Sequence, residues 1–279
     1  MRNKVIRATV AAAAVLALTW VGVEAQGRGR GAGAAAPAKP SQPAPKRDLS
    51  GVWMKGAAPA GVKQFDGSAW TPGIEPPLSA WGLAEKSKSK ANNSGDFQLD
   101  ETNDPVLTKC YPPGVPRVYF HPYPFEIIQT PKSVLQIFEY DHFMRRFWTD
   151  GRPIPADPDQ LWMGTSIGKW LNDTTFEVVT VGFNTKTWID RSGTPHSEQL
   201  KVTERFHRLD MDHLEIEFTF EDPKALAKPW ITKGFFELRP GWELGEISCS
   251  GDYLTWPGAE RPAPRGWQAR RPGAGPYLP

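Results

Sequence analysis

The sequence predicts an all-β fold, an antiparallel meander of about eight to ten strands closed into a barrel. Apolar and polar residues alternate with period two over residues 199–209 and 214–221, which is the pattern of half-buried antiparallel strands. Turn signals at residues 172–173, 210–212 and 240–241 recur at hairpin spacing. The 28 prolines and 26 glycines leave little room for helix. A two-sheet sandwich of the same strands is the alternative.

The expected strands follow one another from residue 125 onward. They are placed at residues 125–130, 134–140, 143–149, 164–171, 175–183, 200–209, 214–221, 231–239 and 242–249. Residues 111–124 contain five prolines and are expected to form a stiff, extended lead into the first strand. A series of hairpins of this kind closes most naturally into an up-and-down barrel.

The barrel is expected to form one domain over residues 48–256. Its first part, residues 48–124, alternates Pro/Gly turns with isolated aromatic residues, so we expect a long irregular segment that wraps the barrel and holds one short helix near residues 79–90. Residues 26–47 and 257–279 are rich in Gly, Pro and basic residues without apolar periodicity. They are predicted to be a disordered linker and a disordered tail.

The N-terminus predicts export. Residues 1–25 combine basic residues, an apolar run and a small-residue cleavage site at Ala25, the pattern of a secretory signal peptide. The apolar run is short for a membrane span of about 20 residues, so we expect cleavage near Gln26, no stable membrane insertion, and a periplasmic or secreted protein of a bacterium. In that oxidising compartment Cys110 and Cys249, the only two cysteines, are expected to form a disulfide. Two free buried thiols are the alternative.

A short motif opens the strand series. Gly51, Val52 and Trp53 form a Gly-X-Trp that recurs at residues 168–170. A Gly-X-Trp at the entrance of a meander barrel resembles the lipocalins and the wider calycin families, and the resemblance implies a barrel that holds a small apolar ligand. Residues 123–246 also resemble uncharacterised exported bacterial proteins, through blocks such as PYPFEI and TWIDRSGTPHSE. That second resemblance implies no particular chemistry.

Composition narrows the class of partner. The net charge of only +2 argues against a nucleic-acid partner. The 12 tryptophans exceed what a core usually requires, which predicts a cleft for a flat apolar, aromatic or sugar-like small molecule. The five histidines show no metal-ligand spacing, and no GxSxG sequence is present. We therefore expect no metal and no cofactor, while the oligomeric state is not predicted.

Two loops gather side chains suited to acid–base chemistry and anion binding. Residues 150–162 and 188–198 connect neighbouring strand pairs, so we expect them to meet over one mouth of the barrel. There His196, supported by Asp190 or Asp141, would transfer protons. The candidate ligand-binding residues of these loops and their neighbours are Arg152, Arg191, Trp148, Trp162 and Trp188. A structural role in tight loops is the alternative interpretation for all of them.

A carboxylate interrupts the apolar face of one strand. Glu204 lies between apolar neighbours, where burial is costly unless the group is paired or used. We expect Glu139 and Arg146 to face the same interior, with Glu177 as a further inward carboxylate. Either these residues form a structural ion pair, or a carboxylate of raised pKa acts as an acid or base together with His196. A shift of one residue in strand register would reverse these orientations.

Three function classes follow. The first is an exported barrel that binds a small molecule in a Trp-lined pocket. The second is a cofactor-independent hydrolase, lyase or isomerase on the same barrel that uses Glu204 and His196. The third is an envelope interaction module that uses the Gly/Pro-rich ends of the chain.

Overall fold

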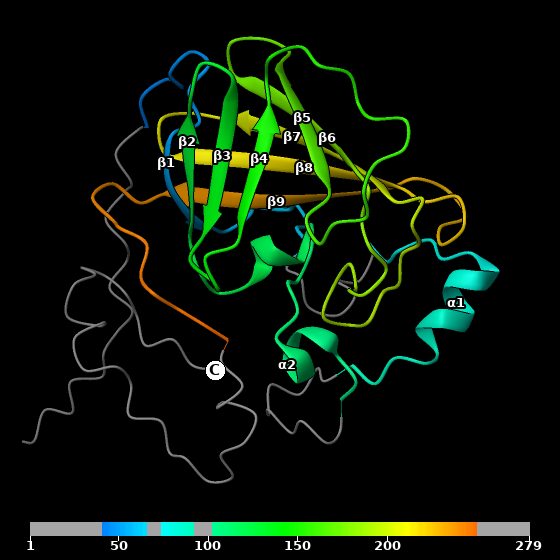
Figure 1. The fold of residues 1–279 in the computed structure, drawn as a ribbon. Helices are drawn as coiled ribbons and strands as arrows, with labels where there is room; N and C mark the ends of the chain where they lie inside the picture. The colour runs from blue at the N-terminus through cyan, green and yellow to red at the C-terminus, as the bar shows by residue number, and fades with distance from the viewer. Residues whose placement is uncertain (1–40, 66–73, 92–101, 250–279) are drawn as a thin grey trace, which may run out of the picture. The chain divides into compact units, whose positions relative to one another are not determined.

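The computed structural model describes residues 41–65, 74–91 and 102–249. Nine strands form a closed barrel in which each strand pairs with the next and β9 pairs with β1 (Figure 1). The strands are β1 (Gly51–Lys55), β2 (Phe125–Gln129), β3 (Ser133–Phe138), β4 (Met144–Trp148), β5 (Thr165–Trp170), β6 (Thr175–Val181), β7 (Lys201–Arg208), β8 (His213–Glu221) and β9 (Trp230–Leu238). The expected closed all-β barrel is confirmed. The predicted signal peptide and the predicted tail at residues 257–279 lie outside the described residues.

The strand pairing departs from a pure meander at one place. Eight pairs are antiparallel, but β4 and β5 are parallel. A parallel pair needs a crossover of a dozen or more residues, and residues 149–164 supply it. The expected strand at residues 242–249 is also wrong, because only Ile247 there pairs, with Tyr140. β1 takes the closing position instead, between β2 and β9.

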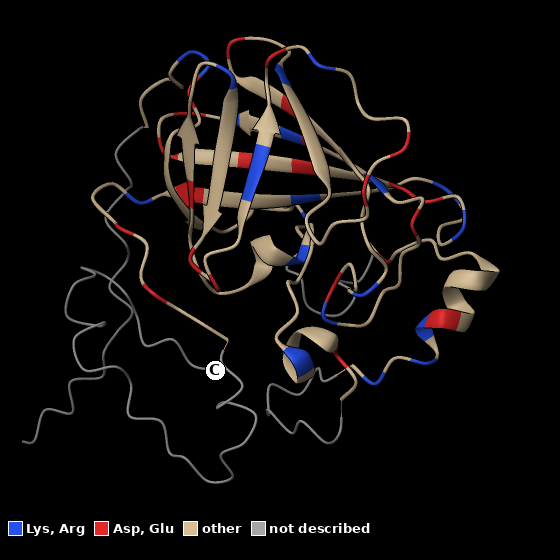
Figure 2. Cartoon of the chain, viewed as in Figure 1, with Lys and Arg blue, Asp and Glu red and all other residues tan. Residues whose placement is uncertain are grey.

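The outer surface carries charges of both signs (Figure 2). Across β5 to β8 these charges form a ladder, since Glu177 pairs with Lys169 and Arg205, and Arg205 also approaches Glu217. The expected inward orientation of Glu177 is therefore wrong. Among the described residues no helix is both long and apolar enough to cross a membrane.

The alternation predicted for β7 and β8 is confirmed. Leu214, Ile216, Phe218 and Phe220 all point inward and have no exposed surface. Their burial, with that of the inward residues of the other strands, forms one apolar core, and the removal of this apolar surface from water is the main driving force for closing the barrel.

A short helix fills the barrel. Residues 111–124 were expected to be extended, but they contain the 3-10 helix η2 (Arg117–Phe120), whose four residues are all buried. The Tyr119 ring meets Phe125, Phe138 and Phe218 edge-on, with ring centroids 5.3 to 5.4 Å apart. These partners come from three different strands, so Tyr119 occupies the space that a ligand takes in an open barrel. We call residues 114–121 the plug.

One ion pair and one disulfide anchor the plug and the residues just before it. The short helix α2 (Pro105–Lys109) precedes it, capped by Asp104, whose carboxylate also forms two hydrogen bonds with the guanidinium of Arg117. Cys110 ends α2, and its sulfur lies 2.20 Å from that of Cys249. The predicted disulfide pair is thus confirmed, and it joins the chain just before the plug to the chain beyond β9.

Candidate functional site

Glu204 lies at the centre of a buried polar cluster inside the barrel. Its carboxylate receives hydrogen bonds from Arg145 at 2.5 and 3.0 Å and from the Tyr119 hydroxyl at 2.6 Å. Arg145 Nη2, the nitrogen 2.5 Å from Glu204, also donates to the Thr180 hydroxyl oxygen at 3.2 Å. Glu204 itself has no exposed surface. The expected inward orientation of Glu204 is confirmed, and its direct hydrogen-bond partners come from β4 and the plug.

The arginine in this cluster is Arg145, whereas the sequence predicted its neighbour Arg146. Val134, Gln136 and Phe138 of β3 and Arg145 of β4 are buried, whereas Arg146 is exposed. Because side chains alternate along a strand, a register error of one residue exchanged the two faces. Arg146 instead lies over the ring of Trp148 on the outer face of β4.

The cluster has the electrostatics of a structural ion pair. Burial alone would lower the pKa of Arg145, but the charge of Glu204 raises it above its ordinary value. Burial also raises the pKa of Tyr119 well above its ordinary value, and the charge of Glu204 adds to this effect. Arg145 therefore stays charged and Tyr119 stays neutral, which fits the interpretation of the cluster as a structural ion pair.

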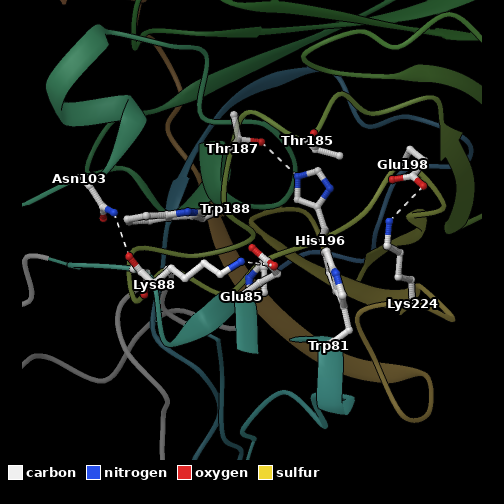
Figure 3. A pocket seen from close by; sticks show the side chains of 13 residues that line it. Trp81, Glu85, Lys88, Asn103, Thr185, Thr187, Trp188, His196, Glu198 and Lys224 are labelled. Atoms are coloured by element: carbon white, nitrogen blue, oxygen red, sulfur yellow. Dashed lines mark hydrogen bonds and ion pairs between the residues drawn. The ribbon is translucent and has the colours of Figure 1, made fainter. Parts of the chain in front are cut away.

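A pocket of about 340 Å³ lies where α1 (Ala80–Lys86) meets the loop before β7 (Figure 3). This volume is near the lower end of the range of about 300–1,000 Å³ for ligand sites. We call it the tryptophan pocket. Its lining residues are Trp81, Glu85, Lys88, Ser89, Asn103, Thr185, Thr187, Trp188, Gly193, Pro195, His196, Glu198 and Lys224.

His196 is neutral in the wall of this pocket. Burial lowers its pKa, although a hydrogen bond to the Ser197 carbonyl and the charge of Asp222 oppose the shift. Nδ1 lies 3.1 Å from the Ser197 carbonyl oxygen and Nε2 lies 3.3 Å from Thr187 Oγ1. Because a carbonyl only accepts, we assign the proton to Nδ1, and Nε2 then accepts the hydroxyl proton of Thr187.

The sequence positions α1 closely against the pocket. Ser79 caps the helix by accepting a hydrogen bond from the Gly82 amide, and its hydroxyl donates to the Lys224 carbonyl. A Cβ at Gly82 would overlap the carbonyl oxygen of Ala225, so glycine permits this close approach. Trp81 is thereby held beneath the Lys224 ammonium, which lies 4.9 Å from its ring. This contact fixes one indole wall of the pocket.

Two buried aspartates hold the loops that border the pocket. Asp190 accepts hydrogen bonds from the Ser192 hydroxyl and from the amide and hydroxyl of Thr194. Asp222 accepts from the amide and hydroxyl of Ser197 and from the amides of Lys224 and Ala225. Asp190, expected as a catalytic support, does not line the pocket and instead organises the loop that carries Trp188.

The charged side chains of the pocket are paired. Lys88 lies 2.5 Å from Glu85, and Lys224 lies 3.4 Å from Glu198. Hydrogen bonds hold the pKa of Glu198 below its ordinary value, first from its own backbone and then from Lys224. With His196 neutral, the four charges cancel.

The other expected residues lie elsewhere. Asp141 accepts the Cys249 amide, and Glu139 is buried beyond β3, where it accepts the Gly245 amide. Arg152 pairs with Asp150 and stacks 3.7 Å from the Trp148 ring centroid. These positions place none of these residues in the tryptophan pocket.

Loop 150–162 contributes nothing to the lining of that pocket. Trp162 packs instead on Tyr111, and Arg191 is half-buried in the loop beside Asp190. Of the two loops expected to meet, only the second one, residues 188–198, forms part of the site. Within the described residues no group of three or more His, Cys, Asp or Glu is placed to hold a metal ion.

Sequence reasoning missed several lining residues and Asp222. Trp81, Glu85 and Lys224 are far from residues 188–198 in sequence, and no spacing rule connects them. Asp222 does have a local signal, because Asp before proline favours a turn with side-chain to backbone hydrogen bonds. Comparisons of the chain with family models, with curated proteins and with solved structures gave no match.

Proposed function

We propose that this protein is an exported small-molecule-binding protein whose site is the tryptophan pocket outside the barrel interior. The observation that carries the proposal is the pairing of Trp81 and Trp188 with a neutral, hydrogen-bonded His196 in one pocket of about 340 Å³. Indole rings offer large contact area with little loss of entropy. Walls fixed by Asp190 and Asp222 reduce the ordering that binding would otherwise require.

The occupied barrel interior supports this location over the ligand site of a calycin. Tyr119 and Phe120 fill the space between the strands, and the Arg145–Glu204 pair lies beneath them. We propose a calycin-like relationship limited to the closed barrel and to the Gly-X-Trp of β1. The parallel β4–β5 pair departs from the antiparallel barrels of the lipocalins.

The arrangement favours binding over the enzyme alternative. Glu204 contacts Arg145 and Tyr119, whereas His196 contacts Thr187 and Ser197, and only His196 lines the pocket. The two groups therefore do not act on one substrate. The envelope-module alternative depends on the ends of the chain, most of which lie outside the described residues.

Export is supported by the signal-like residues 1–25 and by the Cys110–Cys249 pair, because disulfides persist in oxidising compartments. Mass spectrometry of the protein from a bacterial host that expresses the full chain tests this part. We expect a mature form that begins near Gln26, recovered outside the cytoplasm. A full-length cytoplasmic product would contradict export.

Ligand binding is tested by intrinsic fluorescence against hydrophobes, phenolics and sugars. We expect one class to give a saturable change, because Trp188 lines the site. Trp188→Ala should abolish the change, whereas Trp148→Ala, on the outer face of β4, should retain it as a matched control. A flat response to every class would overturn the proposal.

A further inference from the structure

We propose that the tryptophan pocket takes a neutral carbohydrate, with a sugar ring against an indole and its hydroxyls bonded to the polar wall. This inference rests on the proposed function and names the class of ligand. It depends on three properties of the pocket, which are its polar lining, its cancelled charge and its indole surfaces.

The lining is mostly polar. Nine of the thirteen lining residues, the two tryptophans not counted, carry hydrogen-bonding side chains. An apolar ligand of the same size would remove water from these groups without replacing its hydrogen bonds, and each unsatisfied buried group is costly. A ligand with many hydroxyls offers a donor and an acceptor at each position. The pocket therefore discriminates against plain hydrophobes and simple aromatic rings.

The cancelled charge gives a charged ligand no electrostatic advantage over a neutral one. Each lysine of the pocket has a carboxylate partner, Glu85 for Lys88 and Glu198 for Lys224, and His196 is uncharged. An anion would meet both carboxylates, and a cation would meet both lysines, so neither gains a net attraction. Neutral sugars are favoured over uronic acids and over amino compounds.

The indoles supply the apolar contact that a sugar ring needs. Trp81, Trp188 and His196 line one pocket, and Figure 3 shows the Lys88–Glu85 pair between the two indoles and the Lys224–Glu198 pair beyond His196. Trp81 and Trp188 are both half-buried and both line the pocket, but the ammonium of Lys224 covers one face of Trp81. Trp188 is thus the main stacking surface, and the Thr187 hydroxyl, held as a donor to His196, offers its lone pairs to a ligand hydroxyl.

The inference is tested by calorimetry and saturation-transfer NMR with the folded, mature chain. The probes are neutral di- and trisaccharides of glucose, galactose, mannose, xylose and N-acetylglucosamine, a galacturonic acid trisaccharide, 2-naphthol and a dodecyl maltoside below its micelle concentration. We expect saturable binding of at least one neutral saccharide, and weaker binding of the uronic trisaccharide and of 2-naphthol by about tenfold or more.

Variants locate the binding. Trp188→Ala should lower the affinity for the saccharide by about tenfold or more. Trp188→Phe should lower this affinity by less, and Trp148→Ala should leave it unchanged. Equal melting temperatures of the three variants exclude loss of folding as the cause.

The outcomes separate this inference from the proposed function. Binding of 2-naphthol that depends on Trp188, with no saccharide bound, would overturn the carbohydrate inference and leave the proposed pocket intact. Saccharide binding that survives Trp188→Ala would place the site elsewhere and overturn both. Absence of binding by every probe would also overturn both.

Discussion

Arg145 and Glu204 form a two-point ion pair inside the barrel, with nitrogen–oxygen distances of 2.5 and 3.0 Å and side chains no more than 1% exposed. Removing one partner leaves the other charge buried and uncompensated. Glu204→Gln should therefore lower the free energy of unfolding by about 3–5 kcal/mol. Urea unfolding followed by circular dichroism measures the loss.

A neighbouring residue gives the control for this prediction. Arg146→Met, one residue along β4 but on the outer face, should change stability by only about 0.5 kcal/mol. The double variant Arg145→Met/Glu204→Leu should be more stable than either single variant, since no charge is left unpaired. Equal losses from Arg145→Met and Arg146→Met would contradict the inward orientation of Arg145.

One buried histidine, His196, and one half-buried histidine, His121, predict a loss of folding stability in mild acid. Burial lowers the pKa of His121 to about 3, and burial also lowers that of His196. The unfolded chain binds these protons near pH 6.5 and the folded chain does not, so stability is full above that pH. As the pH falls below about 6.5, each histidine should lower the free energy of unfolding by up to about 1.4 kcal/mol per pH unit.

Unfolding measured between pH 7 and pH 5 checks this prediction, because most carboxylates do not titrate there. His121→Phe, which keeps a ring against Tyr140, should flatten the dependence. A slope unaffected by His121→Phe would show that this ring takes up its proton in the folded state.

Reduction of the Cys110–Cys249 disulfide is expected to lower the stability of the fold strongly. The cysteines are separated by 139 residues, and a crosslink across so long a loop restricts the unfolded chain strongly. Replacing both with serine should cost about 2–5 kcal/mol. Melting temperatures with and without reductant measure this loss of stability. The melting temperature of the double serine variant should not change with reductant. An unchanged melting temperature on reduction would contradict a stabilising crosslink.

The close contact of α1 at Gly82 is expected to link the packing of this helix to ligand binding. Gly82→Ala forces α1 away from the Ala225 carbonyl and should cost about 1–3 kcal/mol as an overpacked contact. Because Trp81 moves with the helix, ligand affinity should fall as well. Leu83→Ala, exposed on the same helix, is the matched control. Unchanged affinity in Gly82→Ala would remove Trp81 from the binding surface.

The strands with one apolar face were predictable from sequence. On β8 the buried residues alternate cleanly with glutamates and threonine, so burial fixes the register. On β3, Val134 and Phe138 compete with Leu135 and Ile137, and both faces look apolar. Alternation alone cannot choose between them, which is why Arg146 was expected where Arg145 lies. Glu204 was found because it interrupts a clean pattern.

The plug and the pocket were not predictable for a different reason. Proline restricts the backbone but does not prevent a single 3-10 turn, so the proline-rich segment gave no sign that Tyr119 enters the barrel. The pocket joins α1 to residues 185–198 and to Lys224, and contacts between segments so distant in sequence depend on the closed fold. Of the lining residues, only Trp188 and His196 were predicted from the sequence to have a catalytic or binding role.

Hydrogen–deuterium exchange with and without a saturating saccharide tests most directly that the ligand site lies outside the barrel interior. We expect slower exchange over residues 80–89 and 185–198, with unchanged exchange in the plug and in β7. Protection confined to residues 114–121 and the strands around Glu204 would contradict the account, because the ligand would then displace the plug and enter the barrel.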